Sequence, residues 1–152
     1  MRQRKNTVCN SMGMKKLRFI DDEVILQILQ DLRSIEKKAA IEIYCNGKTA
    51  LQFIPGAMSP DKQNWLRRKR NTVLHFGMST MEFHKKIQGD ASLISEKYGL
   101  DASAYTVVPG AIPLEMEYGG VVGCLAITGL SPEEDHALAE RLLQNAIERQ
   151  YE

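Results

Sequence analysis

The chain of 152 residues is 43% hydrophobic and 26% charged, which is the composition of one globular domain with a single core. Its 20 basic and 19 acidic residues give a net charge of +1, so the overall charge offers no attraction to nucleic acid or to an anionic membrane. Such a balance leaves self-association unopposed, and no apolar run approaches the roughly 20 residues of a membrane span. These features predict no nucleic-acid or membrane partner and are compatible with a homo-oligomer.

Residues 1–16 are predicted to be an N-terminal extension, and residues 17–152 to form one domain. The extension is basic but lacks the apolar segment of a secretory signal. Cys9, Cys45 and Cys124 are isolated in the sequence and odd in number, which argues against a disulfide framework and against a structural zinc site. We therefore predict a cytoplasmic protein.

The first helix is predicted to begin after Asp21 or Asp22, either of which can cap its N-terminus. Apolar residues at helical spacing share one of its faces, namely Val24, Ile25, Ile28, Leu29, Leu32 and Ile35. Residues 40–44 and 48–54 then form two strands joined at Asn46-Gly47, since both positions tolerate the positive φ of a type I′ turn.

The second helix is predicted to open at Ser59-Pro60 and to extend to about residue 75, because proline is favoured at the first helical position. Phe76-Gly77 ends it. Ser79 can cap a third helix that runs through about Gln88, and residues 89–104 are predicted to be a loop with one helical turn.

Three strands are predicted next, at residues 105–108, 112–118 and 120–128, with Gly119-Gly120 as the turn between the last two. A final helix starts at Ser131. The order α-β-β-α-α-β-β-β-α, with short hairpin links, predicts an α+β fold with helices packed on an antiparallel sheet.

The glycines of residues 119–123 resemble a phosphate-binding loop, but such a loop leads into a helix, and these lead into a strand. The hairpin is therefore the favoured interpretation. Gly123 lies inside the strand, where a glycine often marks a bulge or the close approach of a ligand or another backbone.

The start of the final helix, residues 131–136, contains acidic residues and a histidine. Ser131 and Glu134 form a predicted capping box, so most of these residues are explained by helix initiation. Asp135 and His136 fall at or inside the apolar sector of the helix and are expected to point toward the sheet. Either a satisfied buried pair or a functional site fits this position, and the spacing predicts no metal site.

Residues 65–70, W-L-R-R-K-R, form the basic cluster of the chain. On a helical wheel Lys69 lies between Trp65 and Val73 on the apolar side, whereas Arg67, Arg68, Asn71 and His75 lie on the opposite, predicted solvent-exposed side. Lys69 is therefore expected either to extend past the apolar residues or to meet a carboxylate. A lysine held on an apolar face is unusual, which makes it a candidate ligand-binding residue.

Residues 65–78, 107–113 and 119–136 resemble the GlcG/HbpS-like family of haem-degrading or haem-binding domains, in particular a branch with a W-x-x-R-K-R helix. The motif stands here as Trp65, Arg68, Lys69 and Arg70. The resemblance implies a profilin-like α/β sandwich with a five-stranded antiparallel sheet, assembly into dimers or larger rings, and haem as a possible ligand.

Two hypotheses follow. The first is an oligomeric binding or accessory protein for haem or a small organic anion, with Lys69, Gly123, Asp135 and His136 as the ligand-binding residues. The alternative is an enzyme, for example one of haem degradation, in which Asp135 or His136 acts as acid or base and Lys69 stabilises charge. A dry salt bridge between Lys69 and Asp135 would instead favour a structural role. Because no catalytic set is complete, the first hypothesis is preferred.

Overall fold

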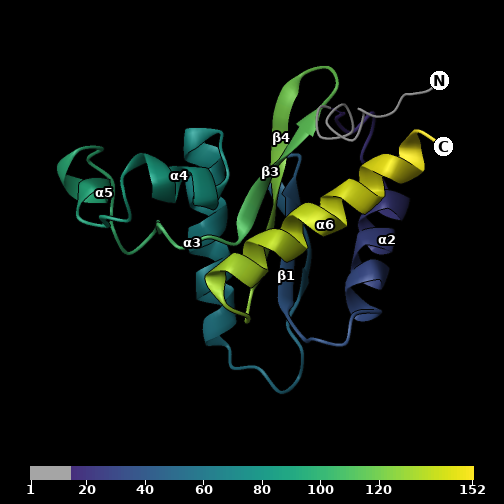
Figure 1. Cartoon of the computed structure of the whole chain (residues 1–152), viewed down its shortest axis with the longest axis horizontal. Coiled ribbons are helices and arrows are strands. Elements are labelled where there is room, and N and C mark those ends of the chain that lie inside the picture. The colour runs from purple at the N-terminus through teal and green to yellow at the C-terminus, as the bar shows by residue number, and fades with distance from the viewer. Residues whose placement is uncertain (1–14) are drawn as a thin grey trace.

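A computed structural model describes residues 15–152, so nearly all of the predicted extension, and Cys9 with it, lies outside the described residues. Four helices and four strands, with one further helical turn, form the described part (Figure 1). In chain order they are α2 (Asp22–Arg33), β1 (Ala40–Cys45), β2 (Lys48–Phe53), α3 (Asp61–Phe76), α4 (Thr80–Lys86), the short α5 (Leu93–Glu96), β3 (Ala111–Met116), β4 (Gly120–Thr128) and α6 (Pro132–Gln150). Among these residues, no helix has the length and apolar character needed to cross a membrane.

The four strands form one antiparallel sheet in the order β2-β1-β4-β3. Its centre is the pairing of β1 with β4, in which Ala40 lies opposite Thr128 and Cys45 opposite Gly123. In Figure 1, α6 crosses in front of the sheet beside α2, and the α4–α5 region projects to the left. The predicted α+β class and antiparallel sheet are confirmed.

The two faces of the sheet carry side chains of different size, because successive strand residues point to opposite faces. Large aliphatic residues such as Ile41, Ile43, Leu125 and Ile127 pack with α2 and α6 in the main core. The face toward α3 carries mostly small residues: Ala40, Ala111, Cys124 and Ala126, which pack with Leu66 and Val73. Small side chains let α3 lie close to the sheet, so polar groups of α3 can reach strand carbonyls.

The predicted strand at residues 105–108 is wrong, so the sheet has four strands rather than five. The backbone of this segment bonds to side chains of α3 instead of to a strand. Arg68 and Asn71 donate to carbonyl oxygens of residues 105 and 104 at 3.0 and 2.9 Å. The Thr72 hydroxyl accepts from the N–H of Thr106 at 3.0 Å. Arg68 and Asn71, predicted on the solvent-exposed side of the helix, are half-buried by these contacts.

Local signals placed most element boundaries correctly. Asp21 caps α2, Ser79 caps α4, and Ser131 forms the predicted capping box with Glu134 at the start of α6. The Asn46-Gly47 turn has positive φ at both residues, as its sequence predicts. The second hairpin differs, because residues 117–119 form its loop and Gly120 already belongs to β4.

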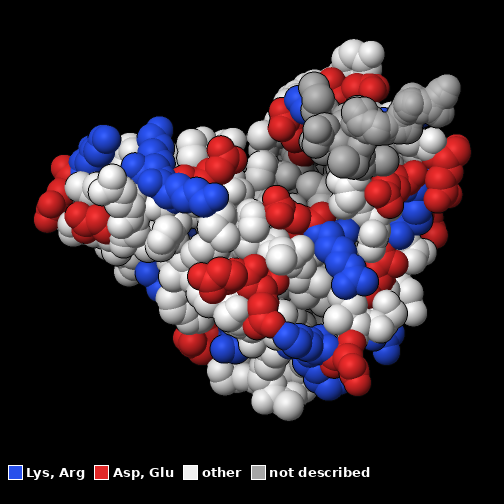
Figure 2. All heavy atoms as spheres, viewed as in Figure 1, with Lys and Arg blue, Asp and Glu red and all other residues white. Residues whose placement is uncertain are grey.

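The face of the molecule in Figure 2 carries basic and acidic side chains close together over most of its area. One basic strip lies over the projecting α4–α5 end, where Lys85 and Lys86 end α4. The rest of this face carries no extended basic surface, consistent with the balanced composition.

Candidate functional site

Lys69 lies on the side of α3 that faces the sheet, in line with Leu66 and Val73, as the helical wheel predicts. It is among the largest fully buried side chains of the described residues, with 1% of its surface exposed. Buried lysines are rare unless they are paired, so its surroundings must supply both a counter-charge and hydrogen-bond acceptors.

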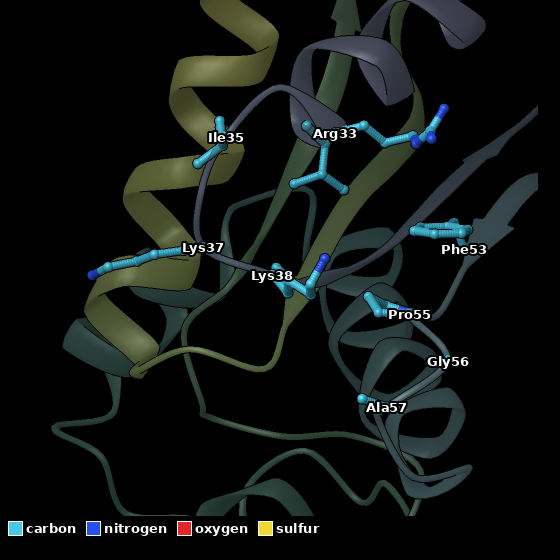
Figure 3. A pocket seen from close by; sticks show the side chains of 10 residues that line it. Arg33, Ile35, Lys37, Lys38, Phe53, Pro55, Gly56 and Ala57 are labelled. Carbon is cyan, nitrogen blue, oxygen red and sulfur yellow. The ribbon is translucent and has the colours of Figure 1, made fainter.

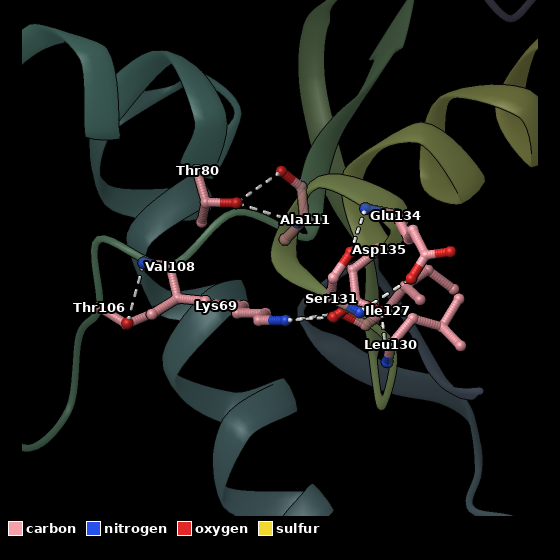
Figure 4. A network of polar contacts seen from close by, with 10 residues as sticks. All are labelled: Lys69, Thr80, Thr106, Val108, Ala111, Ile127, Leu130, Ser131, Glu134 and Asp135. Carbon is pink, nitrogen blue, oxygen red and sulfur yellow. Dashed lines mark hydrogen bonds and ion pairs between the residues drawn. The ribbon is translucent and has the colours of Figure 1, made fainter. Parts of the chain in front are cut away.

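Asp135 supplies the counter-charge. The Lys69 ammonium donates to the carbonyl oxygen of Ile127 at 2.9 Å and to Oδ2 of Asp135 at 3.2 Å (Figure 4). Only 2% of the Lys69 side chain and 3% of the Asp135 side chain are exposed. The pair therefore joins α3 to the end of β4 and the start of α6 across an interior of low dielectric, as a structural element requires.

The start of α6 fixes the position of Asp135. Ser131 caps the helix, and its hydroxyl accepts from the N–H of Glu134 at 3.2 Å. Asp135 follows directly, and its Oδ1 accepts from the backbone N–H of Leu130 at 3.0 Å. One carboxylate oxygen thus holds the β4–α6 turn while the other meets Lys69. The acidic residues at the helix start also complement its dipole.

Burial opposes the charge on both members of the pair. It lowers the pKa of Lys69, and the negative charge of Asp135 offsets part of that change. Burial likewise raises the pKa of Asp135, and Lys69 offsets part of the rise. Each residue thus keeps its charge because of the other. Removal of one partner leaves the second charge buried without compensation for its desolvation.

Gly110 makes room for the ammonium. A Cβ at this position would lie 2.5 Å from Nζ of Lys69 and 2.7 Å from the carbonyl oxygen of Ile127. Its φ of +142° is a conformation that side chains with a Cβ rarely adopt. The Gly110 carbonyl in turn accepts from the N–H of Ile127 at 2.8 Å. Sequence reasoning missed Gly110, although the Pro109-Gly110 pair before a strand is a signal for special backbone geometry.

A small pocket of about 170 Å³ opens beside the ion pair. Its walls come from α3, from the segment before β3 and from the β4–α6 turn, and they comprise Lys62, Trp65, Lys69, Val108, Thr128, Gly129, Leu130, Pro132 and Asp135. Sequence reasoning missed Thr128, because its place at the end of β4 does not reveal that its side chain faces α3 and the pocket.

The other two predicted site residues do not lie at this pocket. Nε2 of His136 lies 3.3 Å from Oε2 of Glu140, and its buried Nδ1 has no hydrogen-bond partner among the described residues. Gly123 lies where β4 pairs with β1, and a Cβ there would come within 1.9 Å of the Tyr44 carbonyl oxygen. Of the three explanations offered for Gly123, the geometry supports the close approach of another backbone, and the pairing of β4 with β3 also has a bulge-like register shift directly beside Gly123.

A second buried ion pair was not predicted. Arg70 donates to both carboxylate oxygens of Glu42 at 3.0 Å, and Glu42 is only 2% exposed. Thr49 and Gln52 of β2 also donate to this carboxylate. The basic cluster of α3 is therefore largely used within the fold. No group of three or more potential metal ligands was found among residues 15–152, the part of the chain that the structure describes.

Comparison with known proteins agrees with this architecture. Residues 22–144 match the family model described as haem-degrading protein HbpS-like. A UPF0303 protein of Serratia proteamaculans is 36% identical over 111 residues, which cover 70% of this chain and 69% of the relative. A UPF0303 protein of Zymomonas mobilis is 40% identical over 85 residues, 56% of this chain and 46% of the relative. The chain thus spans about half to two thirds of these relatives.

Solved structures share the fold. The crystal structure of Ybr137w protein superposes with a TM-score of 0.82 at 27% identity, covering 99% of this chain and 92% of that chain. The crystal structure of a PduOC–haem complex superposes with a TM-score of 0.67 at 19% identity, covering 84% of this chain and 94% of that chain. At the lower identity the likeness is one of fold alone.

Proposed function

The chain belongs to the HbpS-like family of haem-degrading proteins, and from this premise we propose that it is a binding protein for a small organic anion rather than an enzyme. The proposed site is the pocket beside Lys69 and Asp135. The Lys69–Asp135 pair is itself a dry salt bridge with a structural role, but Lys69 also lines a pocket, and one of its three ammonium donors has no acceptor among the described residues. This observation carries the proposal.

A lysine ammonium has three N–H donors. Two have acceptors, at Ile127 and Asp135, and no other described residue accepts the third. Lys69 also lines the pocket. A carboxylate or similar oxygen that entered there would complete the hydrogen bonding of the ammonium, and a bond to a charged donor contributes more than a neutral one.

The other walls limit the size and character of the ligand. The hydroxyl of Thr128 has no described hydrogen-bond partner and can bind an oxygen, while Trp65, Val108 and Leu130 contribute apolar surface. A volume of about 170 Å³ is equivalent to about five or six water molecules in the liquid. Acids of a few heavy atoms, such as acetate or glycolate, fit this space.

Haem is the second candidate, because the family description and the PduOC–haem structure name it. A porphyrin is far larger than this pocket. The pocket also offers no histidine, cysteine, methionine or tyrosine, the side chains that usually hold haem iron. The described residues of this pocket therefore do not fit haem, and we assign it no role there.

The enzyme hypothesis receives less support. Asp135 is engaged by Lys69 and by the Leu130 N–H, so action as an acid or base would first require breaking a buried ion pair. His136 contacts Glu140 and does not line the pocket.

Homo-oligomer formation and cytoplasmic location stay predictions. Light scattering after size-exclusion chromatography checks the first, and cell fractionation checks the second.

Trp65 provides a direct test, because it lines the pocket and is the only tryptophan of the chain. We expect its fluorescence to change saturably when acetate, glycolate or inorganic phosphate is added. Substitution of Thr128→Val preserves shape and removes one hydroxyl, and we expect it to weaken binding by about two- to tenfold. Haem is titrated in parallel and followed by absorbance.

Lysine variants provide the matched control. Lys62 borders the pocket, whereas Lys85 lies on α4 and does not. Lys62→Met should weaken anion binding, and Lys85→Met should leave it unchanged. Absence of any saturable change with the three anions would refute the proposed function, as would equal effects of the two lysine substitutions. Saturable haem binding without acid binding would favour the second candidate.

A further inference from the structure

A separate, larger pocket lies at the opposite end of β1 from the Asn46-Gly47 turn. Its volume is about 430 Å³, within the roughly 300 to 1,000 Å³ typical of small-molecule sites. The end of α2, the segment that joins α2 to β1, and the turn after β2 form its walls (Figure 3). It shares no lining residue with the pocket beside Lys69.

Two cationic side chains face this pocket without a counter-charge. Arg33 and Lys38 both line it, and neither forms an ion pair or side-chain hydrogen bond with another described residue. In Figure 3 both extend on the side of Phe53. Lys37 also borders the pocket, but it points away toward α6, where it pairs with Glu134. Of the described residues that line this pocket, two are therefore free cations, and a third beside them is already neutralised.

The negative end of the α2 dipole opposes an anion at this side of the pocket. Ser34 satisfies one of the free carbonyl groups at this helix end, since its N–H and its hydroxyl both donate to the Asp31 carbonyl oxygen. Asp31 itself is directed elsewhere and pairs with Arg149. The more favourable position for an anion is consequently beside Lys38, beyond the last turn of the helix.

The remaining walls are apolar. Leu32, Ile35 and Pro55 line the pocket together with Phe53, which is 38% exposed although it is a large aromatic residue. An exposed aromatic ring in a concave site can bury additional area when a flat or aliphatic group packs against it. The walls thus suit an apolar body, and the cations at the rim suit a charged end.

We propose that this pocket binds an organic monoanion with an aromatic or acyl body, its carboxylate between Arg33 and Lys38 and its apolar part against Phe53. The arrangement of two unpaired cations beside an exposed aromatic wall is the observation that carries the proposal. It is independent of the small-anion site, because a ligand here contacts neither Lys69 nor Trp65.

The test uses two probes of nearly equal shape, 2-naphthoate and the uncharged 2-naphthalenemethanol, titrated by calorimetry into the full chain. We expect naphthoate to bind at least tenfold more tightly. Lys38→Gln should weaken naphthoate binding by about tenfold, the loss expected for one charge-assisted hydrogen bond, and should leave the alcohol unaffected. Phe53→Ala should weaken both probes.

Lys37→Gln is the matched control, because it removes a neighbouring charge that points away from the pocket and should leave naphthoate binding unchanged. Equal binding of the acid and the alcohol, no saturable binding, or equal losses in the Lys37→Gln and Lys38→Gln variants would overturn the proposal. Calorimetric titration of naphthoate in excess acetate separates the two sites, because naphthoate bound in the Phe53 pocket is not displaced by acetate bound beside Lys69.

Discussion

The buried pair of Lys69 and Asp135 makes a quantitative prediction. In Lys69→Met, the unbranched methionine keeps most of the side-chain volume, but it leaves the Asp135 carboxylate buried with one remaining donor, the Leu130 N–H. Breaking a buried pair from one side costs about 3 to 5 kcal/mol, because the second charge loses its compensation. We therefore expect Lys69→Met to lower the free energy of unfolding at pH 7 by about that amount.

A contrast within the same chain shows that burial, rather than distance, decides the size of the effect. Lys16 and Glu115 lie closer together, at 2.9 Å, but their side chains are 46% and 42% exposed. Exposed pairs contribute roughly 0 to 1 kcal/mol. Lys16→Met is the matched control, and urea denaturation of both variants and the parent measures the two differences.

The pH dependence follows from the direction of the Asp135 pKa. Burial raises it above the unfolded value, and loss of Lys69 removes the charge that lowers it, so in Lys69→Met it lies higher still. At a pH between the pKa of Asp135 in the unfolded chain and its pKa in the folded chain, the native state binds one proton more than the unfolded state. The stability of Lys69→Met relative to the parent therefore rises as the pH falls. The defect should therefore shrink between pH 7 and pH 5.

Adding Asp135→Asn to Lys69→Met should recover part of the loss, since it removes the unpaired charge and keeps an acceptor for the Leu130 N–H. A defect below about 1 kcal/mol, as expected for the exposed pair, or a defect of the same size at both pH values, would contradict the reasoning.

Two further predictions concern close packing. Gly123→Ala would place a Cβ 1.9 Å from the Tyr44 carbonyl oxygen and should abolish cooperative unfolding or reduce soluble yield. The control Gly99→Ala, with nothing within 4 Å, should cost only about 1 kcal/mol of backbone strain. Similar melting temperatures for the two variants would contradict the close approach of β1. Burial raises the pKa of the Cys45 and Cys124 thiols. In a Cys9→Ser background, neither thiol should therefore react with a thiol reagent at pH 8 until the chain unfolds. Prompt labelling of the native protein would count against their burial.

Local sequence signals were sufficient for most of the fold because their causes are local. A cap such as Asp21 or Ser131 satisfies backbone N–H groups within its own turn, and Asn46-Gly47 adopts its conformation whatever surrounds it. The inward direction of Lys69 and Asp135 also followed from helical spacing. Their 3.2 Å contact did not, because it depends on how α3 and α6 lie against the same end of β4.

The missed features have a common physical origin. Residues 105–108 carry a strand-like pattern, but their backbone bonds to the side chains of Arg68, Thr72 and His84 rather than to a neighbouring strand. A sequence pattern records the preference of a segment and not the identity of its partner. The same applies to Arg70, whose carboxylate partner on β1 lies 28 residues away.

The basic cluster of α3 is the clearest case of charge that serves the fold. Arg68 stacks over Trp65 and bonds to the segment before β3, Lys69 meets Asp135, and Arg70 meets Glu42, so consecutive residues connect the helix to three different parts of the molecule. A helix bound in this way is held in a fixed position, and a pocket beside it is pre-formed. Unpaired positive charge beside the Phe53 pocket lies at Arg33 and Lys38, outside the cluster. Whether a site can bind an anion therefore depends on which cations the fold leaves unpaired. The density of basic residues in the sequence does not indicate where such a site lies.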